Sequence, residues 1–63
     1  MKRRKLIETL RVIAADKGLN YREAEGGEHT RVWIGEFSVS VPRHREINEL
    51  TAKAIIKQAR EAE

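Results

Sequence analysis

The sequence contains no cysteine, one proline and one residue each of tryptophan, tyrosine and phenylalanine. Without cysteine it has neither a disulfide framework nor a thiolate metal site, so an intracellular protein is the default expectation. No apolar run approaches the roughly 20 residues that span a bilayer, and no hydrophobic stretch of the signal-peptide kind follows the basic start. We therefore expect a cytoplasmic protein without a membrane segment.

The chain is also short, which limits the size of the core that it can bury. With 63 residues, a domain buries only about 60% of the surface that its unfolded chain exposes, so we expect modest stability. The sequence shows no internal repeat, low-complexity tract or linker. These features predict one domain over residues 1–63.

The positive charge is concentrated in two places. Basic residues outnumber acidic ones by 13 to 10, and Lys2 and Arg3 belong to a run of four basic residues at positions 2–5. The rest of the chain is close to neutral, which argues against a uniformly basic nucleic-acid binder. The candidate contacts to a polyanion are therefore this run and the segment 42–45. Each is equally well explained as an ordinary group of solvated charges.

Hydrophobic spacing predicts a helix near each end of the chain. From about residue 3 to residue 17, apolar residues recur three and four positions apart, and Gly18 suits the left-handed cap that ends a helix. Near the other end, Asn48 is a candidate N-cap. A second helix is then expected to run to about residue 61, with Ile47 and Leu50 packing at its start. Its predicted buried stripe is Ala52, Ile55, Ile56 and Ala59.

Between the helices the pattern is that of three β-strands. Residues 19–24 alternate, the stretch 25–28 contains two glycines and indicates a loop, and residues 29–34 and 37–41 are rich in β-branched and aromatic side chains. Gly35 and Glu36 between the last two strands suit a type II′ hairpin turn. If Ile34 lies opposite Phe37, the apolar side chains share one face, whereas a slip of one residue would bury Arg31.

The order helix, three strands, helix predicts a two-layer α+β domain with a three-stranded antiparallel sheet and both helices on one face. The other face would be open and would carry His29, Arg31 and Trp33. Double-stranded-RNA-binding domains use this architecture to recognise the shape of RNA and to contact its 2′-hydroxyls and phosphates. A shared architecture does not by itself establish a function.

Three segments together resemble a known family. They are residues 26–29 (Gly-Gly-Glu-His), 39–47 (Val-Ser-Val-Pro-Arg-His-Arg-Glu-Ile) and 51–59 (Thr-Ala-Lys-Ala-Ile-Ile-Lys-Gln-Ala). In order and spacing they are similar to the HicA toxins, small bacterial messenger-RNA interferases that HicB antitoxins neutralise. The likeness covers nearly the whole chain, and each motif alone is only moderately specific.

The HicA resemblance implies a fold like that of a double-stranded-RNA-binding domain and an endoribonuclease that needs no metal or other cofactor. It also implies a catalytic histidine at His29, with messenger RNA as substrate and a HicB-like antitoxin as partner. The family usually has Gly-Ser-His where this chain has Gly27-Glu28-His29. This departure sets a negative charge beside the expected base.

The residue types fit RNA cleavage. RNA carries its own nucleophile, the 2′-hydroxyl, and imidazole is a suitable base to remove its proton because it titrates near pH 6.5 when unperturbed. On the predicted open face, Arg31 could pair with phosphate and Trp33 could stack on an unpaired base. For Arg31 the plainer alternative is an ion pair with a glutamate of the first strand, such as Glu23. For Trp33 the alternatives are that it covers the open face or lies in the antitoxin interface.

His44 lies between Arg43 and Arg45 in the second basic segment, and we expect all three to contact RNA. His44 could also be the general acid for the leaving 5′ oxygen, although simple exposure on a loop is the plainer explanation. Lys2 and Arg3 lie at a helix start, where positive charge opposes the helix dipole, which suggests a use on phosphate or an acidic partner.

No metal site is expected, since two histidines and scattered carboxylates do not form a ligand set.

Two other function classes stay open. One is a non-catalytic RNA-binding module, and the other is a protein-interaction domain for which RNA is irrelevant.

Overall fold

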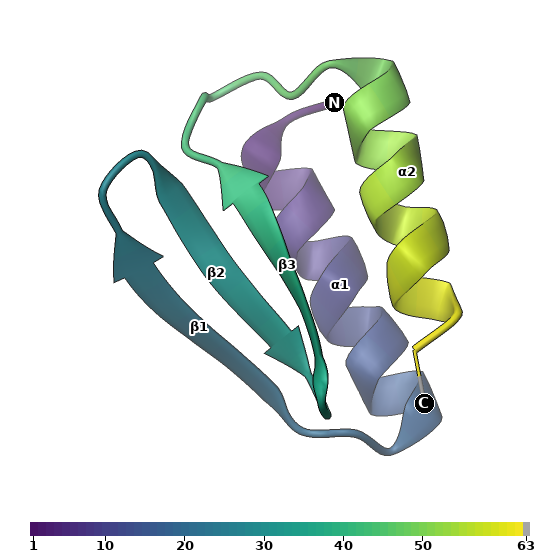
Figure 1. The fold of residues 1–63 in the computed structure, drawn as a ribbon. Coiled ribbons are helices and arrows are strands. Elements are labelled where there is room, and N and C mark those ends of the chain that lie inside the picture. The colour runs from purple at the N-terminus through teal and green to yellow at the C-terminus, as the bar shows by residue number, and fades with distance from the viewer. Residues whose placement is uncertain (63) are drawn as a thin grey trace.

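The computed structural model describes residues 1–62, and residue 63, the last of the predicted domain, lies outside the described residues. The described part consists of helix α1 (Arg3–Lys17), strands β1 (Tyr21–Gly26), β2 (His29–Ile34) and β3 (Phe37–Pro42), and helix α2 (Glu49–Arg60) (Figure 1). The order helix, three strands, helix is therefore confirmed.

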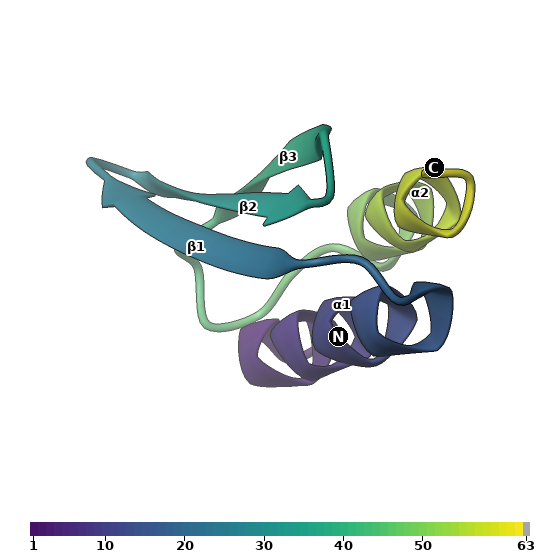
Figure 2. The same ribbon diagram turned by 90° about the horizontal axis from the view of Figure 1, so that it is seen from below.

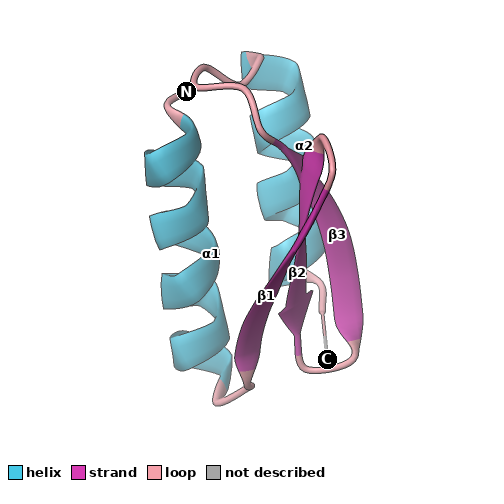
Figure 3. Ribbon diagram, turned by 90° about the vertical axis from the view of Figure 1, so that its left-hand side faces the viewer, coloured by secondary structure: helices cyan, strands magenta, loops and turns pink. Residues whose placement is uncertain are grey.

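These elements form two layers. The strands make an antiparallel sheet in the order β1-β2-β3, and both helices lie on one side of it (Figure 2). The helices run side by side in the same direction, starting from the end where the N-terminus lies (Figures 1 and 3). The predicted α+β class is confirmed, and no element of residues 1–62 covers the other face of the sheet.

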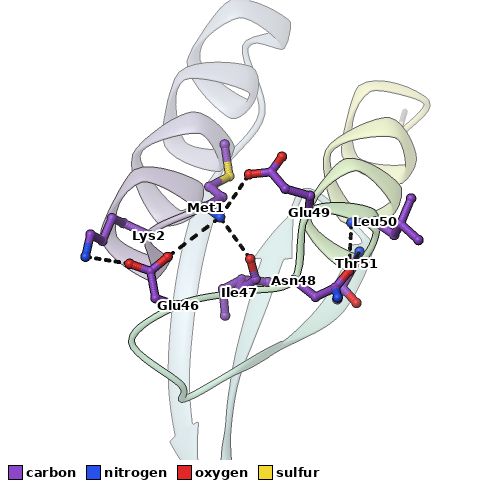
Figure 4. Close-up of polar contacts among 8 residues, drawn as sticks. All are labelled: Met1, Lys2, Glu46, Ile47, Asn48, Glu49, Leu50 and Thr51. Atoms are coloured by element: carbon purple, nitrogen blue, oxygen red, sulfur yellow. Dashed lines mark hydrogen bonds and ion pairs between the residues drawn. The ribbon is translucent and has the colours of Figure 1, made fainter.

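The helices begin and end at their capping residues. α1 ends at Gly18, which adopts a left-handed φ of 68° and donates its amide to the last turn, as Leu19 does. α2 begins at Asn48, whose side-chain oxygen accepts hydrogen bonds from the amides of Leu50 at 2.8 Å and Thr51 at 3.4 Å (Figure 4). Both caps were predicted from the sequence.

The β2–β3 hairpin has the predicted register. Its pairs are Ile34–Phe37, Val32–Val39 and Thr30–Val41 on the helix side, and Trp33–Ser38, Arg31–Ser40 and His29–Pro42 on the open face. Gly35 has a φ of 61°, whereas Glu36 does not have positive φ, because within residues 1–62 only glycines do. A type II′ turn at Gly35 and Glu36 requires this combination. The register therefore fixes which side chains of β2 are available to a ligand.

The core lies between the helix layer and the sheet, and burial of its apolar surface is the main stabilising contribution. Its buried members are Leu6, Leu10, Ile13, Ala14, Val32, Ile34, Val41, Ile47, Ala52, Ile55 and Ala59. Ile56, predicted for the same stripe, is partly buried and packs against it. Neither helix in the described part of the chain has the length and apolar character that a bilayer crossing needs.

The predicted boundaries of the first strand were wrong. β1 spans Tyr21–Gly26 instead of residues 19–24, so the expected loop 25–28 shrinks to a turn of Gly27 and Glu28. Glu25 belongs to the strand because it pairs with Thr30, whose hydroxyl donates to the Glu25 carboxylate at 2.8 Å. Backbone pairing with β2 outweighs the low strand propensity of this segment.

The expected packing of Leu50 was also wrong. Ile47 is buried as predicted, but the Leu50 residue is 79% exposed. Leu50 lies two positions before Ala52, which places it about 200° around the helix from the buried stripe. Leu50 therefore points away from the core.

Candidate functional site

The elements that carry the predicted site residues meet at one end of the molecule. α1 and α2 begin there, β2 begins and β3 ends there, and the connection from β3 to α2 crosses it (Figure 1). The first basic run, the second basic segment and His29 are far apart in sequence. The topology brings all three to this end.

His29 is the first residue of β2, directly after the turn of Gly27 and Glu28. It pairs with Gly26 of β1 and with Pro42 of β3, so it stands at the end of the central strand. Its side chain is exposed, and the alternation along β2 directs it to the open face, because the next residue is buried. A molecule in solution can therefore reach this imidazole without any movement of the core.

Arg43 holds the loop after β3 against the turn before β2. Its amide donates to the Glu28 carbonyl at 3.1 Å, and its guanidinium donates to the Gly27 carbonyl at 3.2 Å. The same guanidinium lies 3.3 Å from the carboxylate of Glu25. These contacts engage a side chain that the sequence predicted as an RNA contact, and they hold the backbone directly before His44.

A hollow of about 280 Å³ lies between the turn and the loop. It is lined by Glu28, His29, Arg43 and His44, and we call it the histidine hollow. The chain has two histidines, and both line this hollow. The structure thus places His44 at the same hollow as His29, the predicted base. The sequence alone did not decide where His44 lies.

A second hollow, of about 350 Å³, involves the same loop. It is lined by Lys2, Arg3, Arg4 and Arg45, and we call it the basic hollow. α1 starts here with no acidic residue in its first turn, so the positive end of its dipole adds to the charge of the side chains. Three of the four residues were predicted to bind RNA. Arg4 was not singled out, although it belongs to the same basic run.

Arg3 is already engaged within the protein. Its guanidinium donates to the hydroxyl of Thr30, which is fully buried, and its Nε donates to the carbonyl of Pro42 at 3.2 Å. The contact reaches from α1 to the sheet directly beside His29. Arg3 therefore supports the end of β2, and its predicted contact with RNA would be an additional role.

The other basic-hollow residues differ in their partners. Lys2 forms an ion pair with Glu46 (Figure 4), and the hydrogen bond from Lys2 holds the pKa of the Glu46 carboxyl below its ordinary value. The side chains of Arg4 and Arg45 make no hydrogen bond or ion pair with residues 1–62. Their guanidinium groups are the ones available to an anion in this hollow.

The open face carries the other two predicted contacts. Trp33 is half-buried beneath the guanidinium of Arg22, which lies 4.7 Å from the ring centroid. Four strand positions, about 13 Å, separate it from His29, so Trp33 lies outside the histidine hollow. Arg31 donates to Ser38 at 3.4 Å. The alternative pairing of Arg31 with Glu23 was wrong, because Glu23 pairs with Val32 and lies on the helix side.

Comparisons with protein-family models, with curated proteins and with solved structures find no match for this chain. The HicA resemblance therefore stays a prediction from the quoted motifs.

Proposed function

We propose that this protein is a HicA-type endoribonuclease, the toxin component of a toxin-antitoxin system, with His29 as the general base. The observation that supports this most directly is the histidine hollow, where an exposed imidazole at a strand end shares one space with Arg43 and His44. The resemblance adds messenger RNA as the substrate, which would place the protein in the cytoplasm.

In this reaction His29 removes the proton of the substrate's 2′-hydroxyl. The 2′ oxygen attacks the neighbouring phosphorus, and a 2′,3′-cyclic phosphate and a 5′-hydroxyl result. A positioned general base typically contributes about 10²–10⁴-fold to the rate. The nucleophile belongs to the substrate, so the proposal requires neither a metal nor another cofactor.

The same proposal gives the remaining predicted residues a use in binding. The basic hollow and Arg31 supply positive charge for the RNA backbone, and such contacts weaken as salt is added. Trp33 offers a surface for an unpaired base. The open face around Trp33 is also the surface that we propose for a HicB-like antitoxin, since tryptophan is enriched at the centres of protein interfaces.

Glu28 favours a second candidate, a non-catalytic RNA-binding module. Glu28 is one of the residues that line the histidine hollow, and its negative charge would repel a phosphate there. This alternative uses the basic hollow equally well. It gives no role, however, to the placement of both histidines in one hollow.

The decisive experiment compares the unaltered protein with His29→Ala, in cleavage assays on RNA and by expression in a host without antitoxin. We expect the variant to lose cleavage and growth arrest and to keep its unfolding midpoint, because the His29 side chain is exposed. Glu36→Ala, in the other turn at the far end of β2, should cleave normally. Toxicity retained by His29→Ala would contradict the proposal, and salt-dependent binding without products would establish the second candidate.

A further inference from the structure

We infer that His44 is the general acid of this cleavage and donates a proton to the leaving 5′ oxygen while His29 accepts the proton of the 2′-hydroxyl. The inference rests on the proposed function and adds a second catalytic residue to it. The observation that carries it is the convergence of the chain's two histidines, one from the start of β2 and one from the loop after β3, on a single hollow.

The chemistry calls for such a group. The 5′ oxygen would leave as a strongly basic alkoxide unless a proton reaches it as the bond breaks, and a positioned acid speeds this step. A guanidinium does not release its proton in proteins, so Arg43 cannot serve. Imidazole both holds and releases a proton near neutral pH. Among the side chains lining the hollow, His44 is therefore the one suited to the task.

The loop that carries His44 is fixed on both sides of it. The preceding residue, Arg43, is bound to the turn next to His29 through the Gly27 and Glu28 carbonyls. The following residue, Arg45, accepts a hydrogen bond at its carbonyl from the amide of Arg3 at 2.9 Å.

Beyond Arg45, the ion pair of Lys2 with Glu46 continues the attachment to the start of α1 (Figure 4). A histidine on a loop held in this way differs from a freely solvated one. The backbone that carries its imidazole is held in place relative to His29 before substrate binds, which favours proton transfer.

The proposed step is one displacement at phosphorus. The bond from the 2′ oxygen to phosphorus forms as the bond from phosphorus to the 5′ oxygen breaks. The proton of the 2′-hydroxyl goes to His29, and a proton of His44 goes to the 5′ oxygen. The products are the 2′,3′-cyclic phosphate and the 5′-hydroxyl, and exchange with water returns both imidazoles to their starting states.

The test uses a leaving group that needs no acid. The cut site is first mapped with the unaltered protein, and two oligonucleotides are then made, one natural and one with sulfur in place of the bridging 5′ oxygen at that site. A thiolate leaves without protonation because thiols are far more acidic than alcohols. We expect His44→Ala to cut the natural RNA about 10²–10⁴-fold more slowly and the sulfur-containing RNA at close to the unaltered rate.

Two further variants make the result specific. His29→Ala should cut both oligonucleotides slowly, because the 2′-hydroxyl still needs a base. Arg45→Ala, the neighbour of His44, should slow both by the same factor through weaker RNA binding. His44→Gln repeats the measurement with a larger polar side chain, so that a folding defect of the alanine variant, which thermal unfolding would reveal, does not decide the outcome.

The possible failures are distinguishable. If the His44 variants cut natural RNA at the unaltered rate, or slow both oligonucleotides equally, the general-acid role is overturned and the proposed function stands. If His29→Ala cuts normally, or the unaltered protein cuts no RNA, the proposed function fails and the role of His44 fails with it.

Discussion

Arg3 joins the two layers of the molecule through one side chain. It starts on α1, and its guanidinium reaches the Thr30 hydroxyl and the Pro42 carbonyl on the sheet. Thr30 is fully buried, and its hydroxyl donates in turn to the Glu25 carboxylate at 2.8 Å. These contacts hold the end of β2 where His29 begins the strand. The structural role of Arg3 thus precedes any contact with RNA.

We expect Arg3→Met to lower the free energy of unfolding by about 1–3 kcal/mol, because part-buried acceptors lose their donor while the aliphatic stem is kept. Arg4→Met is the matched control. It removes the same charge at an exposed residue whose side chain has no partner in residues 1–62, so its effect should stay within about 0.5 kcal/mol. Urea unfolding followed by Trp33 fluorescence measures both. Equal losses would contradict the role assigned to Arg3.

It was harder to predict from the sequence which residues contact one another than which side chains are buried. Spacing alone predicted that Val32, Ile34 and Ile55 are buried, because burial follows the period of each element. The location of His44 could not be predicted in the same way. It depends on hydrogen bonds from Arg43 to backbone carbonyls of a distant turn. Every residue has a backbone carbonyl, so the sequence does not indicate which of them accept such a bond.

The turn between β1 and β2 sets the position of His29, and its two glycines contribute differently. Gly27 has a left-handed φ of 62°, whereas Gly26 does not have positive φ. A side-chain carbon added at either residue would meet no atom within 4 Å. Any difference between substitutions at these two residues therefore comes from the backbone alone.

We predict that Gly27→Ala destabilises the protein by about 1–2 kcal/mol, since an L-residue in the left-handed region is strained by that amount. Gly26→Ala removes freedom from the unfolded chain without this strain, so it should be neutral or stabilising by up to about 1 kcal/mol. Thermal and urea unfolding of the two variants provide the comparison. If Gly26→Ala is the more harmful change, the conformation assigned to this turn is incorrect.

The elements themselves were predictable where their signals are local. Gly18 and Asn48 mark helix ends by their own chemistry, and Gly35 marks the hairpin. β1 carried no such signal in its second half, because Glu25 and Gly26 are poor strand formers. Their conformation is decided by pairing with β2, which becomes visible only when the strands are brought together.

At the scale of the whole molecule, both hollows lie at the end where the two helices begin, and the loop after β3 contributes to each. Arg43 and His44 line the histidine hollow, and Arg45 lines the basic hollow. On the proposed function, RNA backbone held by the basic hollow would lie beside the group that cuts it. The sequence predicted most of these residues, but their division between two hollows depends on the three-dimensional path of the loop.

Away from the hollows, Tyr21 ties the sheet to α1. Its hydroxyl donates to the Glu23 carboxylate at 2.6 Å, and Arg11 of α1 donates to the same oxygen at 3.0 Å. The Arg11 guanidinium also lies 4.8 Å from the Tyr21 ring centroid. Partial burial, followed by the hydrogen bond and negative charge of Glu23, raises the pKa of Tyr21 above its ordinary value of 10.0.

This shift predicts a loss of stability in alkali. The folded chain keeps the phenol proton at a pH where the unfolded chain releases it, so the contribution of Tyr21 is fully present below pH 10.0 and is lost as the pH rises from there towards the raised pKa. In urea titrations across this range, the free energy of unfolding should fall more steeply for the unaltered protein than for Tyr21→Phe. The substitution leaves the side chain of every other titratable residue unchanged, so the difference between the two proteins isolates the phenol. Because the chain has one tyrosine, phenolate absorbance follows the group directly, and an ordinary tyrosine titration in the folded protein would contradict the prediction.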